Sequence, residues 1–226
     1  MARSNEPDRW GSLPSLYAIT PQWPLDRLLP QLAELTRTSN TIVQVRDKGL
    51  PDDAIAARAQ AVVDTCRATS TVCIVNDRPE IAAHVGAHGV HVGAGDASVA
   101  DARTIMKDGL VGATCRTFDQ AQRAVADGAD YLGVGPIFPT ISKTGLPEPL
   151  GLDTLAEITA TITIPVYAIG GITVERAAGV IQAGAHGVAA ISALFSGDTS
   201  TAVNAAAFER AMATATRLPD TSLTET

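Results

Sequence analysis

Short apolar runs recur along the chain, and each ends at a polar residue or a glycine. Within each run the apolar residues are continuous rather than alternating, and Val or Ile dominate, which is typical of parallel strands buried on both faces. We therefore predict eight strands: Leu16–Thr20, Thr41–Arg46, Val72–Asn76, Gly89–Gly93, Leu110–Thr114, Asp130–Gly135, Pro165–Gly170 and Gly187–Ser192.

Segments rich in Ala, Leu, Gln and Arg lie between these runs and indicate helices. The clearest are Asp52–Ala68, Ala97–Lys107, Phe118–Asp127, Val174–Ala183 and Val203–Thr216. Pro24, Pro51 and Pro79 stand where the first turn of a helix tolerates a missing N–H group. Strand and helix patterns therefore alternate along the whole chain.

A glycine recurs at the end of three of these units, as Gly86, Gly128 and Gly184, where it can supply a left-handed helix cap before the next strand. Eight strand–helix units of about 28 residues each predict a single (β/α)₈ barrel, of the α/β class. A doubly wound sheet is the alternative, although it usually has fewer strands and a topological switch point. We expect the barrel over residues 13–217, with flexible tails at 1–12 and 218–226.

Composition narrows the classes of partner. The 226 residues are 46% hydrophobic but only 4% aromatic, which predicts a core of branched aliphatic side chains and alanine. With 17 basic and 24 acidic residues, the net charge of −7 argues against nucleic acid or a membrane surface as partner. We expect small-molecule substrates, and the sequence leaves a homodimer open.

The cysteines Cys66, Cys73 and Cys115 are too few and too scattered for a disulfide framework or a zinc knuckle. Free thiols in a reducing compartment are the interpretation we prefer. The first ten residues lack the apolar segment of a signal peptide, and no run reaches the length of about 18 apolar residues that a membrane helix needs. These patterns predict a cytoplasmic protein.

The carboxyl ends of barrel strands are where function collects. Arg46, Lys48 and Lys143 follow strands there and favour an anionic ligand, while Asp77 and Asp96 end neighbouring strands and suit Mg²⁺. Cations and carboxylates together predict a diphosphate held partly through Mg²⁺. The alternative is a network of salt bridges, in which Arg46 and Lys48 pair with Asp77 and with the adjacent Asp47.

A second phosphate site is indicated by Gly170-Gly171 and Ile191-Ser192, which follow the last two strands, although a tight turn alone would also explain the glycines. Three further residues carry less weight. His88 precedes a strand and belongs on the opposite face, whereas His91 lies within that strand and could line the barrel. Cys115 has no histidine base in its own segment and is no obvious nucleophile.

These rim segments resemble the thiamine-phosphate synthase family from about Leu16 to Phe195. Gln44–Lys48 reads Gln-Val-Arg-Asp-Lys where the family has Gln-x-Arg-Glu-Lys, and Pro136–Lys143 is similar to Pro-Ile-Phe-Pro-Thr-x-Thr-Lys. Asn76-Asp77 and the Gly-x-His-x-Gly-x-x-Asp run that ends at Asp96 also match. The larger departure is Arg116, which stands where the family has His and to which we assign no role.

The resemblance implies a transferase that joins hydroxymethylpyrimidine diphosphate to hydroxyethylthiazole phosphate, giving thiamine phosphate and pyrophosphate. By position, Gln44 would read the pyrimidine, and the metal ligands for Mg²⁺ would be Asp77 and Asp96. The diphosphate would be held by Arg46, Lys48, Asn76, Thr114 and Lys143. The thiazole phosphate would be held by Thr140, Ser142, Gly171, Ile191 and Ser192.

The mechanism that we expect is dissociative, because the ring amino group of the pyrimidine can share positive charge while diphosphate leaves. Arg46, Lys48 and Lys143 would act on the leaving group, and the thiazole nitrogen would then attack. Two alternatives stay open: a thiazole tautomerase on the same barrel, and a non-enzymatic phosphate-binding sensor.

Overall fold

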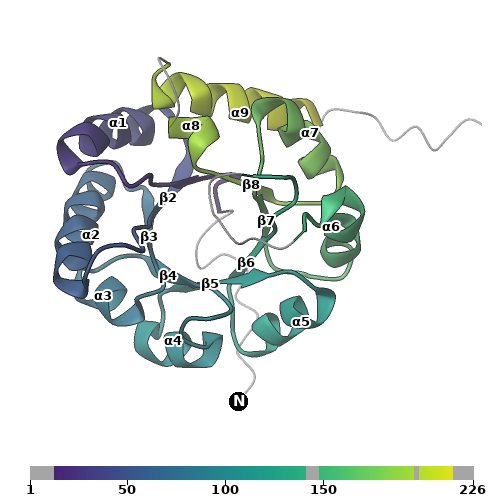
Figure 1. The fold of residues 1–226 in the computed structure, drawn as a ribbon, viewed down its shortest axis with the longest axis horizontal. Coiled ribbons are helices and arrows are strands. Elements are labelled where there is room, and N and C mark those ends of the chain that lie inside the picture. Colours follow the sequence, from purple (N-terminus) through teal and green to yellow (C-terminus); the bar gives the residue numbers. More distant parts are fainter. Residues whose placement is uncertain (1–12, 141–147, 196–198, 216–226) are drawn as a thin grey trace, which may run out of the picture.

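The structure, a computed structural model, describes residues 13–140, 148–195 and 199–215. Parallel strands form a closed barrel in the order β1 to β8, with each strand paired to the next and β8 paired to β1. Figure 1 shows the helices as a ring around this barrel. The (β/α)₈ prediction is confirmed. The two predicted tails, 1–12 and 218–226, lie outside the described residues.

The strands agree with the predicted runs to within one or two residues at their ends. They are β1 (Leu16–Ile19), β2 (Thr41–Val45), β3 (Val72–Asn76), β4 (Gly89–Val92), β5 (Leu110–Cys115), β6 (Tyr131–Val134), β7 (Val166–Ile169) and β8 (Gly187–Ala190). Most positions in these strands are buried, because one face of the sheet meets the helices and the other fills the barrel.

The five helices predicted with bounds are present, and so are α1 and α3, whose starts Pro24 and Pro79 had indicated; the described residues add α6 and α8. The helices are α1 (Leu25–Thr38), α2 (Asp52–Arg67), α3 (Pro79–His84), α4 (Val99–Met106), α5 (Phe118–Ala126), α6 (Gly151–Thr159), α7 (Val174–Gln182), α8 (Ser192–Phe195) and α9 (Thr201–Ala215). Pro79 occupies the first turn of α3, while Pro24 and Pro51 are the N-cap residues of α1 and α2. Gly86, Gly128 and Gly184 have positive φ angles of 66°, 97° and 85°, as the predicted caps require.

The core has two layers with different compositions. Between sheet and helices it consists mainly of Val, Leu, Ile and Ala, as predicted. Inside the barrel, however, Tyr17, Tyr131 and Tyr167 pack against one another and against Ile and Leu side chains. The expectation of an aliphatic core is therefore wrong for the barrel interior, where all three tyrosines of the sequence gather. None of the helices that the structure describes has the length and apolar character to cross a membrane.

Candidate active site

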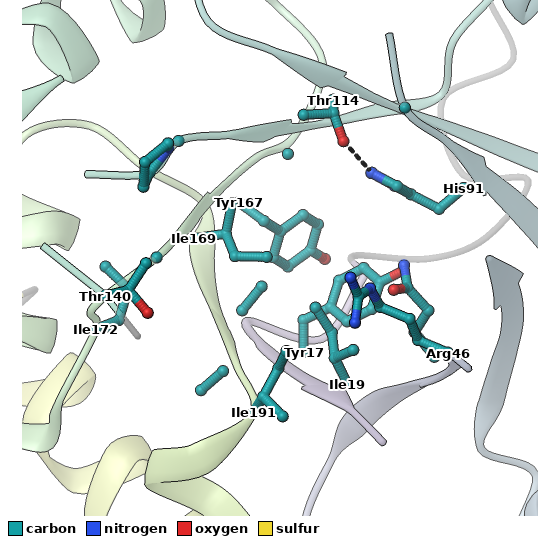
Figure 2. Close-up of a pocket in the computed structure, with 18 of the residues that line it drawn as sticks. Tyr17, Ile19, Arg46, His91, Thr114, Thr140, Tyr167, Ile169, Ile172 and Ile191 are labelled. Carbon is teal, nitrogen blue, oxygen red and sulfur yellow. Dashed lines mark hydrogen bonds between the residues drawn. The ribbon is translucent and has the colours of Figure 1, made fainter. Parts of the chain in front are cut away.

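One cavity of about 980 Å³ lies at the carboxyl ends of the strands. Figure 2 shows the side chain of Arg46 on one side of this cavity and those of Thr140 and Ile172 on the other. Every predicted site residue that the structure describes lines it: Gln44, Arg46, Lys48, Asn76, Asp77, Asp96, Thr114, Thr140, Gly171, Ile191 and Ser192. Ser142 and Lys143 lie outside the described residues.

An acidic pair faces a lysine at the ends of β3 and β4. The Asp77 backbone N–H donates to the carbonyl oxygen of His91 at 2.8 Å, which ties the end of β3 to β4. Lys48 Nζ lies 2.7 Å from Asp77 Oδ2 and 4.0 Å from Asp96 Oδ2. Asp77 has a φ of 63°, a left-handed conformation that costs free energy for a non-glycine residue and is found preferentially at functional sites.

The two carboxylates have pKa values shifted in opposite directions. Burial, and then the hydrogen bond with Asp96, raise the pKa of Asp77, against the effect of Lys48. Partial burial acts in the same upward direction on Asp96, but the hydrogen bond with Asp77 and the charge of Lys48 outweigh it and lower its pKa. Two carboxylates in contact, with their mutual repulsion only partly relieved by Lys48, have the chemistry that suits a hard divalent cation such as Mg²⁺.

The salt-bridge alternative explains part of this rim. Lys48 does pair with Asp77, but Asp47 turns elsewhere: it accepts from Gln22 Nε2 at 2.9 Å and lies 4.0 Å from Arg58 Nε. Arg46 lines the cavity, and its backbone N–H is anchored by the Thr20 hydroxyl at 3.0 Å. Among the described residues Arg46 forms no ion pair with these carboxylates. Its position therefore favours binding of an anionic ligand over a purely structural role.

The glycine pair after β7 has a structural role as well as its place in the cavity wall. Gly170 and Gly171 have φ angles of 92° and 66°, and a Cβ atom at Gly171 would lie 2.4 Å from the carbonyl oxygen of Pro139. The Phe138 N–H donates to the Gly170 oxygen at 3.0 Å. Glycine here allows the segment after β6 to pack directly on the turn after β7.

Two arginines of the cavity wall have contacts that the sequence did not indicate. Arg116 donates to the carbonyl oxygens of Gly135, at 3.1 Å, and Glu148, at 2.8 Å, and so joins the two described ends of the segment between β6 and α6. Arg176 donates to the Gly171 oxygen at 2.6 Å, with its guanidinium 4.6 Å from the centroid of the ring of Phe138. The sequence signal that could have identified Arg176 was the presence of a cation shortly after the glycine pair that follows a strand.

Inside the barrel, His91 lines the cavity, as its place within a strand had suggested. Its Nε2 lies 2.9 Å from the Thr114 hydroxyl, the bond drawn in Figure 2. Burial lowers the pKa of His91 to about 4, so its imidazole is neutral near pH 7. Burial raises the pKa of Cys115 to about 11, which leaves a thiol rather than a nucleophilic thiolate.

Comparison with known proteins agrees with this geometry. The family model of thiamine monophosphate synthase (TMP-TENI) matches residues 16–194, which span the barrel from β1 to α8. The chain belongs to the thiamine monophosphate synthase family. Its activity is that of a thiamine-phosphate synthase, a transferase of thiamine biosynthesis.

Individual relatives support the same assignment. The thiamine-phosphate synthase of Chloroflexus aurantiacus is 44% identical over 162 residues, which cover 72% of this chain and 75% of that protein. That of Salinispora arenicola is 43% identical over 187 residues, 81% of this chain and 90% of its own. The solved structure of thiamine phosphate pyrophosphorylase from Pyrococcus furiosus superposes with a TM-score of 0.81 at 28% identity, covering 90% of this chain and 98% of that one.

Proposed function

We propose that this thiamine-phosphate synthase condenses 4-amino-2-methyl-5-(hydroxymethyl)pyrimidine diphosphate with 4-methyl-5-(2-hydroxyethyl)thiazole phosphate. The products are thiamine phosphate and pyrophosphate. The observation that carries the proposal is the convergence of rim cations, a carboxylate pair and a glycine turn on one cavity. One side of that cavity suits a diphosphate and the other a monophosphate.

The diphosphate end is formed by Arg46, Lys48, Asn76 and Thr114, with Lys143 as an expectation from the sequence. Asp77 and Asp96 would hold Mg²⁺, which when bound supplies positive charge to the leaving diphosphate. Arg46 and Lys48 add positive charge from the protein, in a cavity partly walled by apolar side chains where such charges act strongly.

The second substrate lies, in this proposal, against Thr140, Gly171, Ile191 and Ser192, with Ser142 as a further expectation from the sequence. The Gly171 backbone can approach a phosphate closely because it has no side chain. The thiazole nitrogen can then be held in line with the carbon that diphosphate leaves. This order of steps needs no protein nucleophile, in agreement with the buried Cys115 thiol.

Incubation with both substrates and Mg²⁺ tests the reaction through the release of pyrophosphate and the appearance of thiamine phosphate. Isomerisation of the thiazole phosphate without pyrophosphate would instead indicate a tautomerase, and binding without turnover would indicate a sensor. The three buried free cysteines are compatible with a cytoplasmic enzyme, which we include in the proposal.

The carboxylate pair is tested by Asp77→Ala. Losing transition-state stabilisation of about 2.7–4 kcal/mol should lower turnover by two or more orders of magnitude while the circular dichroism spectrum stays that of the folded barrel. Lys143→Ala should have a similar effect. The matched control is Asp64→Ala, because Asp64 is an exposed carboxylate on α2 paired with Arg67. Turnover near that of the wild type in both site variants would refute this assignment of the rim.

A further inference from the structure

Five polar side chains form a continuous line of hydrogen bonds across the barrel interior, on the wall of the cavity. Gln44 Nε2 donates to the Tyr17 hydroxyl at 2.9 Å, and that hydroxyl lies 2.8 Å from the hydroxyl of Tyr131. Tyr131 Oη lies 3.2 Å from His91 Nδ1, and His91 Nε2 lies 2.9 Å from Thr114 Oγ1. We call these five residues, contributed by β1, β2, β4, β5 and β6, the interior network.

The direction of every proton in the interior network follows from its first bond. An amide nitrogen only donates, so the Tyr17 oxygen accepts from Gln44 and the Tyr17 proton goes to Tyr131. Tyr131 then donates to Nδ1 of the neutral His91, which carries its own proton on Nε2 and donates it to Thr114. The Thr114 hydroxyl proton is left for a ligand, and Gln44 presents its Oε1 as an acceptor.

Turning the Gln44 amide over would reverse every bond. Tyr17 would donate to Gln44 and Tyr131 to Tyr17, His91 would donate from Nδ1, and Nε2 would accept from Thr114. Thr114 would then offer a ligand only lone pairs, while Gln44 would offer its NH₂ group. In the first direction Gln44 accepts from a ligand and Thr114 donates to it. In the reversed direction Gln44 donates and Thr114 accepts. The two residues therefore change together.

The rings of the interior network are held in place by close packing. A Cβ atom at residue 112 would lie 2.1 Å from Cζ of the Tyr131 ring, so only glycine on β5 leaves room for that ring. Tyr131 and Tyr17 are fully buried, with ring centroids 5.7 Å apart. Rings confined in this way cannot move apart to break a hydrogen bond. A reversal of the hydrogen bond at Gln44 therefore requires a reversal at Thr114.

We propose that the interior network couples the two halves of one substrate, so that an amino group bound at Gln44 sets Thr114 as a donor toward the diphosphate. Tyr17, Tyr131 and His91 are positioning residues in this scheme, acting through Gln44 and Thr114. The inference rests on the proposed function, because that function supplies a ligand with a donor at one end and an anion at the other.

The test begins with Gln44→Glu, whose ionised carboxylate accepts only. Tyr17 must then donate to it, which sets the reversed direction and turns Thr114 into an acceptor. The probe is pyrophosphate with Mg²⁺ held constant, titrated calorimetrically. Because a hydrogen bond to a charged group is lost, and a charge is added, we expect Kd for pyrophosphate to rise by more than about tenfold.

Repeating Gln44→Glu in the Tyr131→Phe variant separates the effect of hydrogen-bond direction on pyrophosphate binding from the effect of the added charge. Tyr131→Phe removes the middle hydroxyl, so Gln44→Glu in that background should weaken pyrophosphate binding only by its charge, a several-fold smaller effect. The matched control is Tyr167→Phe, since Tyr167 packs edge-on against Tyr17 but donates to the Pro14 carbonyl, outside the interior network. In that control Gln44→Glu should act as it does in the wild type.

Equal effects of Gln44→Glu in the wild type and in Tyr131→Phe would overturn the coupling, while pyrophosphate release by the wild type would still uphold the proposed function. A wild type that neither turns over nor binds pyrophosphate would overturn both. If Gln44→Glu does not fold, Tyr17→Phe tests the same link, because it cuts Gln44 off from Thr114. The hydroxymethylpyrimidine alcohol should tighten pyrophosphate binding in the wild type and in Tyr167→Phe but not in Tyr17→Phe. Equal tightening in Tyr17→Phe would refute the proposal.

Discussion

Asp77 and His91 show how burial acts on single ionisable residues at this site. Lys48 Nζ lies 2.7 Å from the Asp77 carboxylate, whose side chain is only 6% exposed, and so offsets part of the cost of burying that charge. For His91 the charge of Asp96 only partly offsets the effect of burial, so its pKa stays below that of a free imidazole and the ring is neutral near pH 7. The same cavity thus holds a lysine beside a carboxylate pair and an uncharged imidazole beside the ring of Tyr131.

The neutral state of His91 predicts a pH dependence of stability. Its pKa is about 4 in the folded protein and about 6.5 for a free side chain, so the unfolded chain takes up a proton that the folded protein refuses. The associated stability is complete above about pH 6.5 and is lost as the pH falls toward 4. Urea unfolding between pH 7 and 4.5 should therefore show a steeper loss of stability in the wild type than in His91→Gln. Parallel curves would contradict the prediction.

At the scale of elements, glycine has different roles in the turn after β7, where Gly171 lies, and in α7, where Gly179 lies. Gly171 has a positive φ and a Cβ there would meet the Pro139 carbonyl oxygen, whereas Gly179 lies within α7 and a Cβ there would make an ordinary contact with Leu152 at 3.6 Å. One glycine is required by the backbone and the other only weakens a helix.

This contrast predicts opposite effects of the same substitution. Gly171→Ala should destabilise the protein by at least about 1–2 kcal/mol, from its left-handed backbone alone, and should raise KM for the thiazole phosphate. Gly179→Ala should stabilise by about 0.5–1 kcal/mol and leave KM unchanged. Thermal unfolding together with steady-state kinetics checks both. A Gly171→Ala variant as stable as the wild type would show that the turn tolerates a side chain.

At the scale of the whole molecule, α9 closes the ring of helices between α7 and α1 (Figure 1). Thr201 begins α9 and donates through Oγ1 to Gln31 Oε1 of α1 at 3.0 Å, which links the last helix to the first. Phe208 of α9 is fully buried in the layer between helices and sheet. Contacts between opposite ends of the sequence therefore contribute to the stability of the barrel.

Phe208→Ala tests that closure. Removing a buried ring should lower the free energy of unfolding by about 3–5 kcal/mol, because lost burial and the remaining cavity add together. Val203→Ala is the control on the same helix, since Val203 is 56% exposed and its truncation should change stability by less than about 0.5 kcal/mol. Denaturant titration measures both, and a small effect at Phe208 would mean that α9 is peripheral to the fold.

The sequence alone was enough to predict the strands, the barrel and those rim residues that the structure describes. Runs such as Thr41–Val45 are continuous in the chain, and the position of Arg46 or Asp77 at a strand end follows from its place after such a run. Helix α1 was less evident, since Pro30 lies inside it. These are local properties, governed by burial of both faces of a parallel sheet and by the loops that must follow each strand.

Only the tertiary structure decided which side chains meet. Tyr17 and Tyr131 are 114 residues apart, and their hydrogen bond depends on the closure of the barrel and on the register of its strands. The same holds for Arg116, whose partners belong to the segment after β6, and for Lys48, which reaches Asp77 rather than its neighbour Asp47. Periodicity determines which face a residue occupies, whereas distances across a closed barrel are set by packing of the whole molecule.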